Sequence, residues 1–225
     1  MTQQGALTLQ AWLSPSYPVG AYAYSHGLEW AVEQGDVTDC ATLATWIAGI
    51  LRHGSGRNDA ILFANAWRDA MAGGANLPAI AELAIALASS RERRLETRQQ
   101  GAAFFTATRA AWPHESIDKF AGAVGENTAY CVCFAACAAA HGLPLRPALD
   151  GFLSAFAANL VSGAVRMNVV GQTAGQQTIA GLSAIASEIA DACENLTLDD
   201  LGGSAFRADL AAILHETQHA RLFRS

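Results

Sequence analysis

Positive charge is scarce in this sequence: its 225 residues include a single lysine, Lys119, and the formal net charge is -6. Nucleic-acid binding draws much of its affinity from clustered cations that neutralise phosphates, so no nucleic-acid partner is expected. A P-loop of the form G-x-x-x-x-G-K-[ST] needs a lysine in a glycine-rich turn, whereas Lys119 lies in the stretch SIDKFAG. The chain is therefore not predicted to be a nucleotide hydrolase of that class.

Charge of either sign is low as well, at 15% of the residues, while 52% are hydrophobic and the mean hydropathy is +0.19. Soluble domains average about 25% charged residues, so this composition excludes a disordered chain and favours a large core. The length suits one domain, which we expect to span residues 1–225. The apolar surplus also indicates that a partner chain covers part of the surface.

Long apolar runs and targeting signals are missing. The longest apolar run, AYCVCFAACAAA at 129–140, falls short of the roughly 20 residues that a bilayer span needs, so it predicts a buried helix rather than a membrane segment. The start, MTQQGALTLQ, lacks the basic residues and apolar stretch of a signal peptide. We therefore expect a cytoplasmic protein with reduced cysteines.

Strand patterns are absent too, because no run alternates β-branched or aromatic residues between two-residue glycine turns. Alanine, leucine, glutamate, arginine and glutamine, the strongest helix formers, fill long stretches. The sequence predicts an all-α fold, a single compact domain of about ten helices. These are expected at 7–13, 25–34, from 38 or 39 to 54, 58–72, 78–88, 90–112, 121–141, 146–167, 171–194 and 204–219.

The cysteines in CVCFAAC invite a metal-site interpretation that helical geometry opposes. At about 100° per residue, Cys131 and Cys133 point about 200° apart on a helix, so they cannot coordinate the same ion. Only Cys133 and Cys137 share a face. We predict that all three are small, buried apolar side chains.

His26 and Glu29 lie three residues apart in SHGLEW, a spacing that places both on one face of a helix, where they can contact one metal. Two ligands do not make a site, so a structural pair or a helix-start cap is the alternative. No nucleophile elbow, HExxH or G-x-G-x-x-G pattern is present, and no catalytic residue is predicted.

A mixed-charge stretch, SSRERRLETRQQG, predicts either a solvated helix face with weak ion pairs or a docking face. Its charged residues are Arg91, Glu92, Arg93, Arg94, Glu96 and Arg98.

Three segments resemble the urease accessory protein UreF family. The N-terminal signature segment, residues 9–35 (LQAWLSPSYPVGAYAYSHGLEWAVEQG), has the family's Pro-Val-Gly turn, aromatic-small-aromatic step and Ser-x-Gly-Leu-Glu. The Arg/Glu segment, residues 89–104, is similar to the family's central helix ending in Gly-Ala-Ala-Phe. The C-terminal tail, residues 215–225 (HETQHARLFRS), looks like the family's last motif, except that His219 and Ala220 replace Tyr-Ser. Val169 also replaces a common proline before Gly-Gln.

The resemblance implies an all-α homodimer without catalysis or a cofactor of its own. Such a protein assembles with the accessory protein UreD (also called UreH) and the GTPase UreG on apo-urease, so that nickel, handled by the assembled complex, enters the active site. The missing P-loop is consistent with docking or regulating a GTPase. The alternatives are a helical metal-dependent enzyme using His26 and Glu29, or a structural helical oligomer without a metallochaperone role.

The resemblance also implies partner-binding residues. On an extended backbone Tyr22 and Tyr24 point the same way, beside His26 and Glu29, which are candidate weak, transient nickel ligands. The alternative is that both rings fill the core and His26 only caps the helix. The tail is expected to order against the UreD-type partner, and a frayed terminus is the alternative. Arg166 is either an arginine finger for the GTPase or a structural arginine at a helix end. The full predicted set is Tyr22, Tyr24, His26, Glu29, Arg166, Gln172, His215, Glu216, Arg221, Leu222, Phe223 and Arg224.

Overall fold

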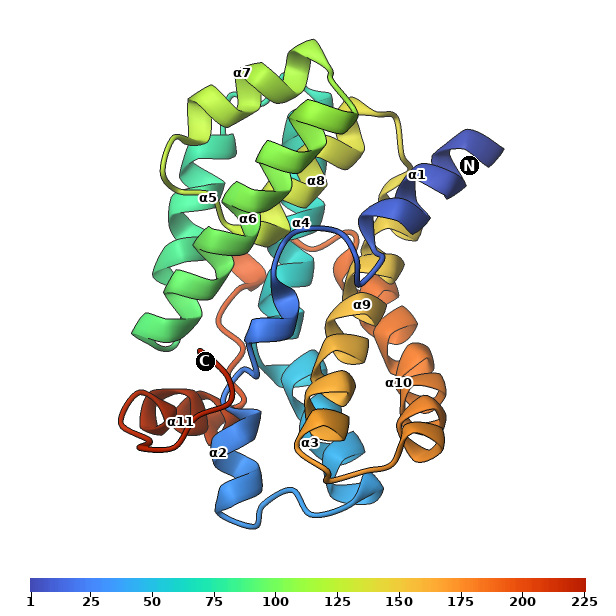
Figure 1. The fold of residues 1–225 in the computed structure, drawn as a ribbon. Coiled ribbons are helices and arrows are strands. Elements are labelled where there is room, and N and C mark those ends of the chain that lie inside the picture. The colour runs from blue at the N-terminus through green and yellow to red at the C-terminus, as the bar shows by residue number, and fades with distance from the viewer.

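The fold is built from helices joined by short turns (Figure 1), and the computed structural model describes all 225 residues. The eleven α-helices are α1 (Gln3–Trp12), α2 (Leu28–Glu33), α3 (Cys40–His53), α4 (Ser55–Met71), α5 (Leu77–Ala86), α6 (Arg91–Ala111), α7 (Glu115–Val124), α8 (Tyr130–Ala140), α9 (Leu145–Arg166), α10 (Gln172–Cys193) and α11 (Phe206–His215). Short 3-10 turns lie at Ala21–Ala23 and Leu198–Asp200. The all-α prediction is confirmed.

The centre of the core is α8, which packs between α4 and α6 and also contacts α5, α7 and α9. All of its residues from Cys131 to Ala139 are buried, and all five cysteines are free thiols, as expected for the apolar run. Alanine and cysteine side chains are small, so the neighbouring helices approach closely. The ring of Phe134 stacks on Phe104 with centroids 4.8 Å apart, which locks α8 against α6.

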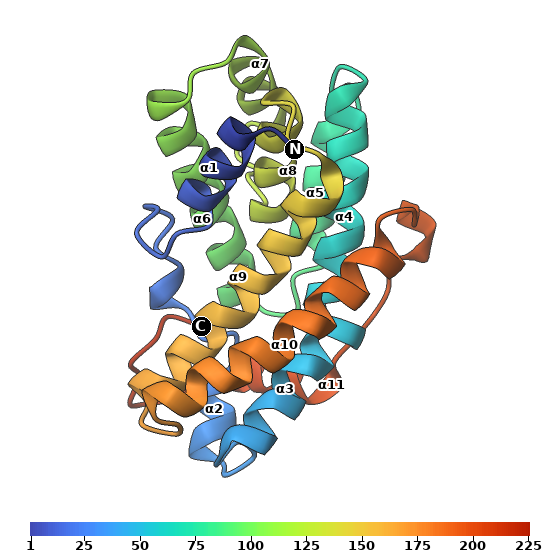
Figure 2. The same ribbon diagram turned by 90° about the vertical axis from the view of Figure 1, so that its right-hand side faces the viewer.

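A second layer is formed by α3, α9 and α10, which lie side by side when the molecule is viewed from its flank (Figure 2). By length and composition alone, α9 is the one helix that could cross a membrane, and half of its apolar window is buried inside the fold. The core helix of a globular protein passes the same test. In this fold α9 packs against α10 and α4 and ends at Arg166, beside the signature segment.

One expected helix, 121–141, is wrong: the structure splits it into the end of α7 and the whole of α8. Gly125, at φ +56°, stops α7 in the left-handed region. The loop that follows packs on α6, where a Cβ on Gly101 would lie 1.8 Å from the backbone oxygen of Thr128. The loop therefore fits because α6 has no side chain at that point.

The expected helix at 25–34 begins later, at Leu28, because His26 and Gly27 both have positive φ. Gly27 is required by a close approach: a Cβ there would lie 2.5 Å from the backbone nitrogen of Ala212 in α11. This contact sets the signature segment directly against α11. At its other end α11 stops at His215, so the tail leaves the helix earlier than the sequence pattern predicts.

Candidate partner-binding site

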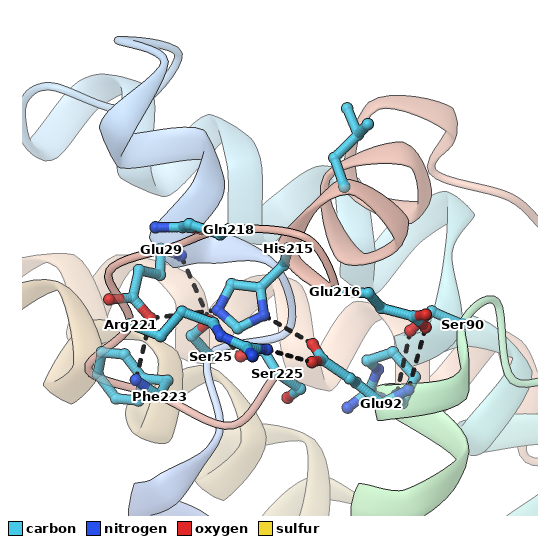
Figure 3. A network of polar contacts seen from close by, with 12 residues as sticks. Ser25, Glu29, Ser90, Glu92, His215, Glu216, Gln218, Arg221, Phe223 and Ser225 are labelled. Carbon is cyan, nitrogen blue, oxygen red and sulfur yellow. Dashed lines mark hydrogen bonds and ion pairs between the residues drawn. The ribbon is translucent and has the colours of Figure 1, made fainter.

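The three segments that carry the family resemblance meet in one place (Figure 3). We call this meeting point the tail cluster: Ser25 and Glu29 from the signature segment, Glu92 and Glu96 from α6, and the tail, residues 215–225. In Figure 1 the tail, in red, curls beside α2 and α11 and ends next to the signature segment. Two backbone hydrogen bonds fasten that end, from Arg224 N to Ala23 O (2.8 Å) and from Ser25 N to Ser225 O (2.6 Å).

Glu29 of α2 anchors the tail backbone. Its two carboxylate oxygens accept hydrogen bonds from the amides of Leu222 (2.6 Å) and Phe223 (2.9 Å). The same carboxylate lies 3.2 Å from Nε2 of His215. Its side chain is only 11% exposed, so these charge-assisted bonds form largely out of water, where they are strongest.

Glu92 of α6 contacts the tail at two points. One oxygen lies 2.6 Å from Nδ1 of His215 and the other accepts a hydrogen bond from Arg221 at 2.7 Å. His215 is fully buried between Glu29 and Glu92. Carboxylates only accept hydrogen bonds, so each ring nitrogen of His215 faces an acceptor.

Glu216 binds the start of α6. Its Oε1 accepts hydrogen bonds from the backbone amides of Arg91 (2.7 Å) and Glu92 (3.3 Å), which have no partner inside the helix. A carboxylate at a helix N-terminus is also stabilised by the helix dipole. The tail therefore supplies part of the cap of α6, beside the N-cap residue Ser90.

Phe223 is buried and packs under Arg166, whose guanidinium carbon lies 4.5 Å from the ring centroid. Arg166 also donates a hydrogen bond to the carbonyl of Tyr22. In this arrangement Arg166 joins α9 to both the signature segment and the tail, rather than bonding the carbonyls at the end of its own helix. Gln172, at the exposed start of α10, makes no hydrogen bond to the tail cluster.

Beneath the tail lies a buried charged layer. Ser225 Oγ donates to Glu96 at 2.7 Å, and Arg93 forms an ion pair with the same carboxylate. Burial raises the pKa of Glu96, but Arg93 and His26 outweigh it and lower that pKa to about 2. Burial, with help from Arg93, lowers the pKa of His26, so the neutral imidazole is favoured.

His26 and Glu29 do not act as a pair. The one-face argument requires both residues to be helical, whereas His26 precedes α2 at φ +58°. His26 Nδ1 contacts Arg93 and Glu96, while Glu29 serves the tail and His215. No group of three or more His, Cys, Asp or Glu side chains in the chain is placed to hold a metal ion.

The two tyrosines of the signature segment point in different directions, which corrects the expectation of a shared face. Ala21–Ala23 forms a 3-10 turn instead of extended chain, so the two-residue alternation does not apply. Tyr22 is 70% exposed, whereas Tyr24 is buried and its hydroxyl donates to Gln99. In the tail, by contrast, alternation holds: Leu222 and Arg224 are exposed while Phe223 and Ser225 are buried.

The sequence analysis did not predict that part of the Arg/Glu segment is buried. Arg91 and Arg94 are exposed to solvent, as one of the two interpretations predicts, but Glu96 is buried and Arg93 is only 11% exposed. The available signal was spacing: positions 93, 96 and 100 continue, at helical intervals, the stripe that Phe104 and Thr108 bury. Polar residues on such a stripe indicate a buried network rather than solvent contact.

Comparison with known proteins gives one consistent result. The UreF family model matches residues 37–183. The chain is 53% identical over 222 residues to the urease accessory protein UreF of Xanthobacter autotrophicus, covering 97% of this chain and 90% of that protein. It is 49% identical to UreF of Mesorhizobium japonicum over 219 residues, covering 97% and 96%. This chain therefore belongs to the UreF family of urease accessory proteins, whose members assist urease rather than catalyse a reaction.

Proposed function

We propose that this chain is a cytoplasmic scaffold for urease maturation, which assembles with a UreD/UreH-type protein and a UreG-type GTPase on apo-urease and promotes nickel insertion. Similarity to named urease accessory proteins along nearly the whole chain carries the proposal. The scaffold works as a homodimer and holds no cofactor of its own. Because the chain has no P-loop, its role toward the GTPase is docking or regulation.

The exposed residues of the tail cluster are the surface we assign to the UreD/UreH-type partner. Leu222 is 55% exposed and Tyr22 70%, and Arg221 and Arg224 frame the leucine. Aromatic and arginine side chains are common at binding hot spots. Glu29 and Glu92 hold the tail in place before any partner arrives, so little ordering entropy is lost on binding.

Two roles remain open for Arg166. A finger for the GTPase would have to leave the Phe223 ring and the Tyr22 carbonyl, whereas a positioning residue would stay there. Replacing Arg166 by alanine separates them. GTP turnover in the assembled complex should fall at normal complex yield in the first case, while tail order and complex yield should fall in the second.

Urease activation tests the function as a whole. The cognate urease operon, with the gene for this chain deleted, is expressed in a urease-negative bacterium supplied with nickel, and the chain is returned on a plasmid. We expect urease activity and nickel content of the purified urease to return with the wild-type chain. If apo-urease stays nickel-free although the chain is folded and expressed, the proposal is wrong.

A further inference from the structure

A cavity of about 290 Å³ lies under the signature segment and is not used by the contacts described so far. Its walls come from the signature segment, α4, α6, α8 and α9. The aromatic residues that line it are Trp12, Tyr17, Tyr22, Tyr130, Phe152 and Phe156. A mostly apolar pocket with a few polar groups is the usual form of a small-molecule site.

Asp59 of α4 supplies a carboxylate to this cavity. It has no cation within ion-pair distance, because Arg93, the nearest guanidinium lining the cavity, is paired with Glu96. Desolvation raises the pKa of Asp59 to about 6, so at neutral pH the cavity contains one carboxylate without a counterion.

His26 also lines the cavity with a ring nitrogen that has no partner. Its Nδ1 contacts both Glu96 at 3.1 Å and Arg93 at 2.9 Å, which leaves Nε2 as the free ring nitrogen. That Nε2 atom is buried and has no hydrogen-bond partner. The ring is held edge-on to Phe156, with centroids 4.7 Å apart, and both residues line the cavity.

We propose that this cavity binds a small organic ammonium ion, with the ammonium group near Asp59 and the carbon skeleton against the aromatic walls. An ammonium group carries donors only, which matches the Asp59 carboxylate, an acceptor without an ion-pair partner. Aromatic faces also attract cations. One unused donor, Nε1 of Trp12, suits a hydroxyl on the ligand.

The arrangement disfavours other ligand classes. An anion would face the carboxylates of Asp59 and Glu96 with only one guanidinium, already paired, to receive it. A metal ion would find no group of three ligating side chains. A neutral molecule would make apolar contacts with the cavity walls but would leave the charge of Asp59 without a partner. The inference concerns the isolated chain and does not depend on its role in urease maturation.

Calorimetric titration of the purified chain at pH 8 tests the proposal with three probes of similar shape. These are phenethylammonium, the neutral 2-phenylethanol and the anion phenylacetate, and tyramine is added as a hydroxylated ammonium. We expect saturable binding of both ammonium ions, weaker binding of the alcohol by about tenfold or more, and none of the anion. Tryptophan fluorescence follows binding independently, because Trp12 lines the cavity.

Two variants locate the binding. Asp59→Asn keeps the shape of the side chain and should raise the Kd of phenethylammonium about tenfold or more, with less effect on the alcohol. Ala155→Trp fills the cavity and should abolish binding of both. Asp118→Asn, at a side chain 62% exposed on α7, is the matched control and should bind like the wild type.

The pH dependence gives a test that needs no variant. The ionisable groups around Asp59 are Arg93 and Glu96 from α6, His26 and the Cys131 thiol of α8. Asp59, with a pKa of about 6, gains its negative charge between pH 5 and 8, so ammonium affinity should rise with pH. Equal affinity for ammonium and alcohol, an unaffected Asp59→Asn variant, or no binding of any probe would each overturn the proposal.

Discussion

The core around α8 and the tail cluster are held together by opposite kinds of interaction. Around α8, small apolar side chains pack closely, and every residue from Cys131 to Ala139 is buried. In the tail cluster, Glu29, Glu92 and Glu216 each bind named donors more than a hundred residues away. The first region gives the molecule its stability, and the second fixes the position of a surface.

The largest effect should come from the core. Replacing Phe134 by alanine removes a fully buried ring that contacts Phe104, Phe63 and Phe152, and should lower the free energy of unfolding by about 3–5 kcal/mol. Urea unfolding followed by circular dichroism measures it. Phe206→Ala, at a side chain 74% exposed, is the control and should change stability by less than about 0.5 kcal/mol.

A smaller and more local effect is expected in the tail cluster. Glu29→Ala leaves the amides of Leu222 and Phe223 without an acceptor, at a cost of about 1–3 kcal/mol. Hydrogen exchange should accelerate at those two amides and stay slow in α8. Glu188→Ala, which removes an exposed carboxylate from α10, is the control and should leave tail exchange unchanged. Uniformly faster exchange would show that the two regions unfold as one unit.

The sequence predicted the first region far better than the second. Composition and helical periodicity identified the α8 core, because burial of apolar side chains depends on residue type and spacing. The tail cluster depends on which distant segments meet, and periodicity carries no such information. Local backbone geometry failed at the same place: positive φ at His26 and the 3-10 turn before it displaced the expected helix and separated Tyr22 from Tyr24. The family resemblance marked the right segments without showing that they touch.

Asp59 of α4 lines the cavity, and its effect on stability should depend on pH. Its pKa is raised to about 6 in the folded chain, so its contribution to stability is present below pH 4 and is lost as pH rises through 6. Asp59→Asn should therefore stabilise the protein by about 1–2 kcal/mol at pH 7.5, after allowance for partial exposure, and by less at pH 4.5. Thermal unfolding at the two pH values measures the difference. A gain of the same size at both would assign the effect to packing instead.

The smallest effect on stability should accompany the largest effect on assembly. Leu222→Asp changes an exposed side chain whose backbone amide stays bound to Glu29, so the free energy of unfolding should change by less than about 0.5 kcal/mol. If Leu222 enters an apolar surface of the partner, Leu222→Asp places an unpaired carboxylate there. This substitution should therefore abolish co-purification with the UreD/UreH-type protein. Leu7→Asp, at a leucine 53% exposed on α1, is the matched control and should leave the complex intact. A full complex yield with Leu222→Asp would move the partner surface away from the tail and leave the cluster a structural role alone.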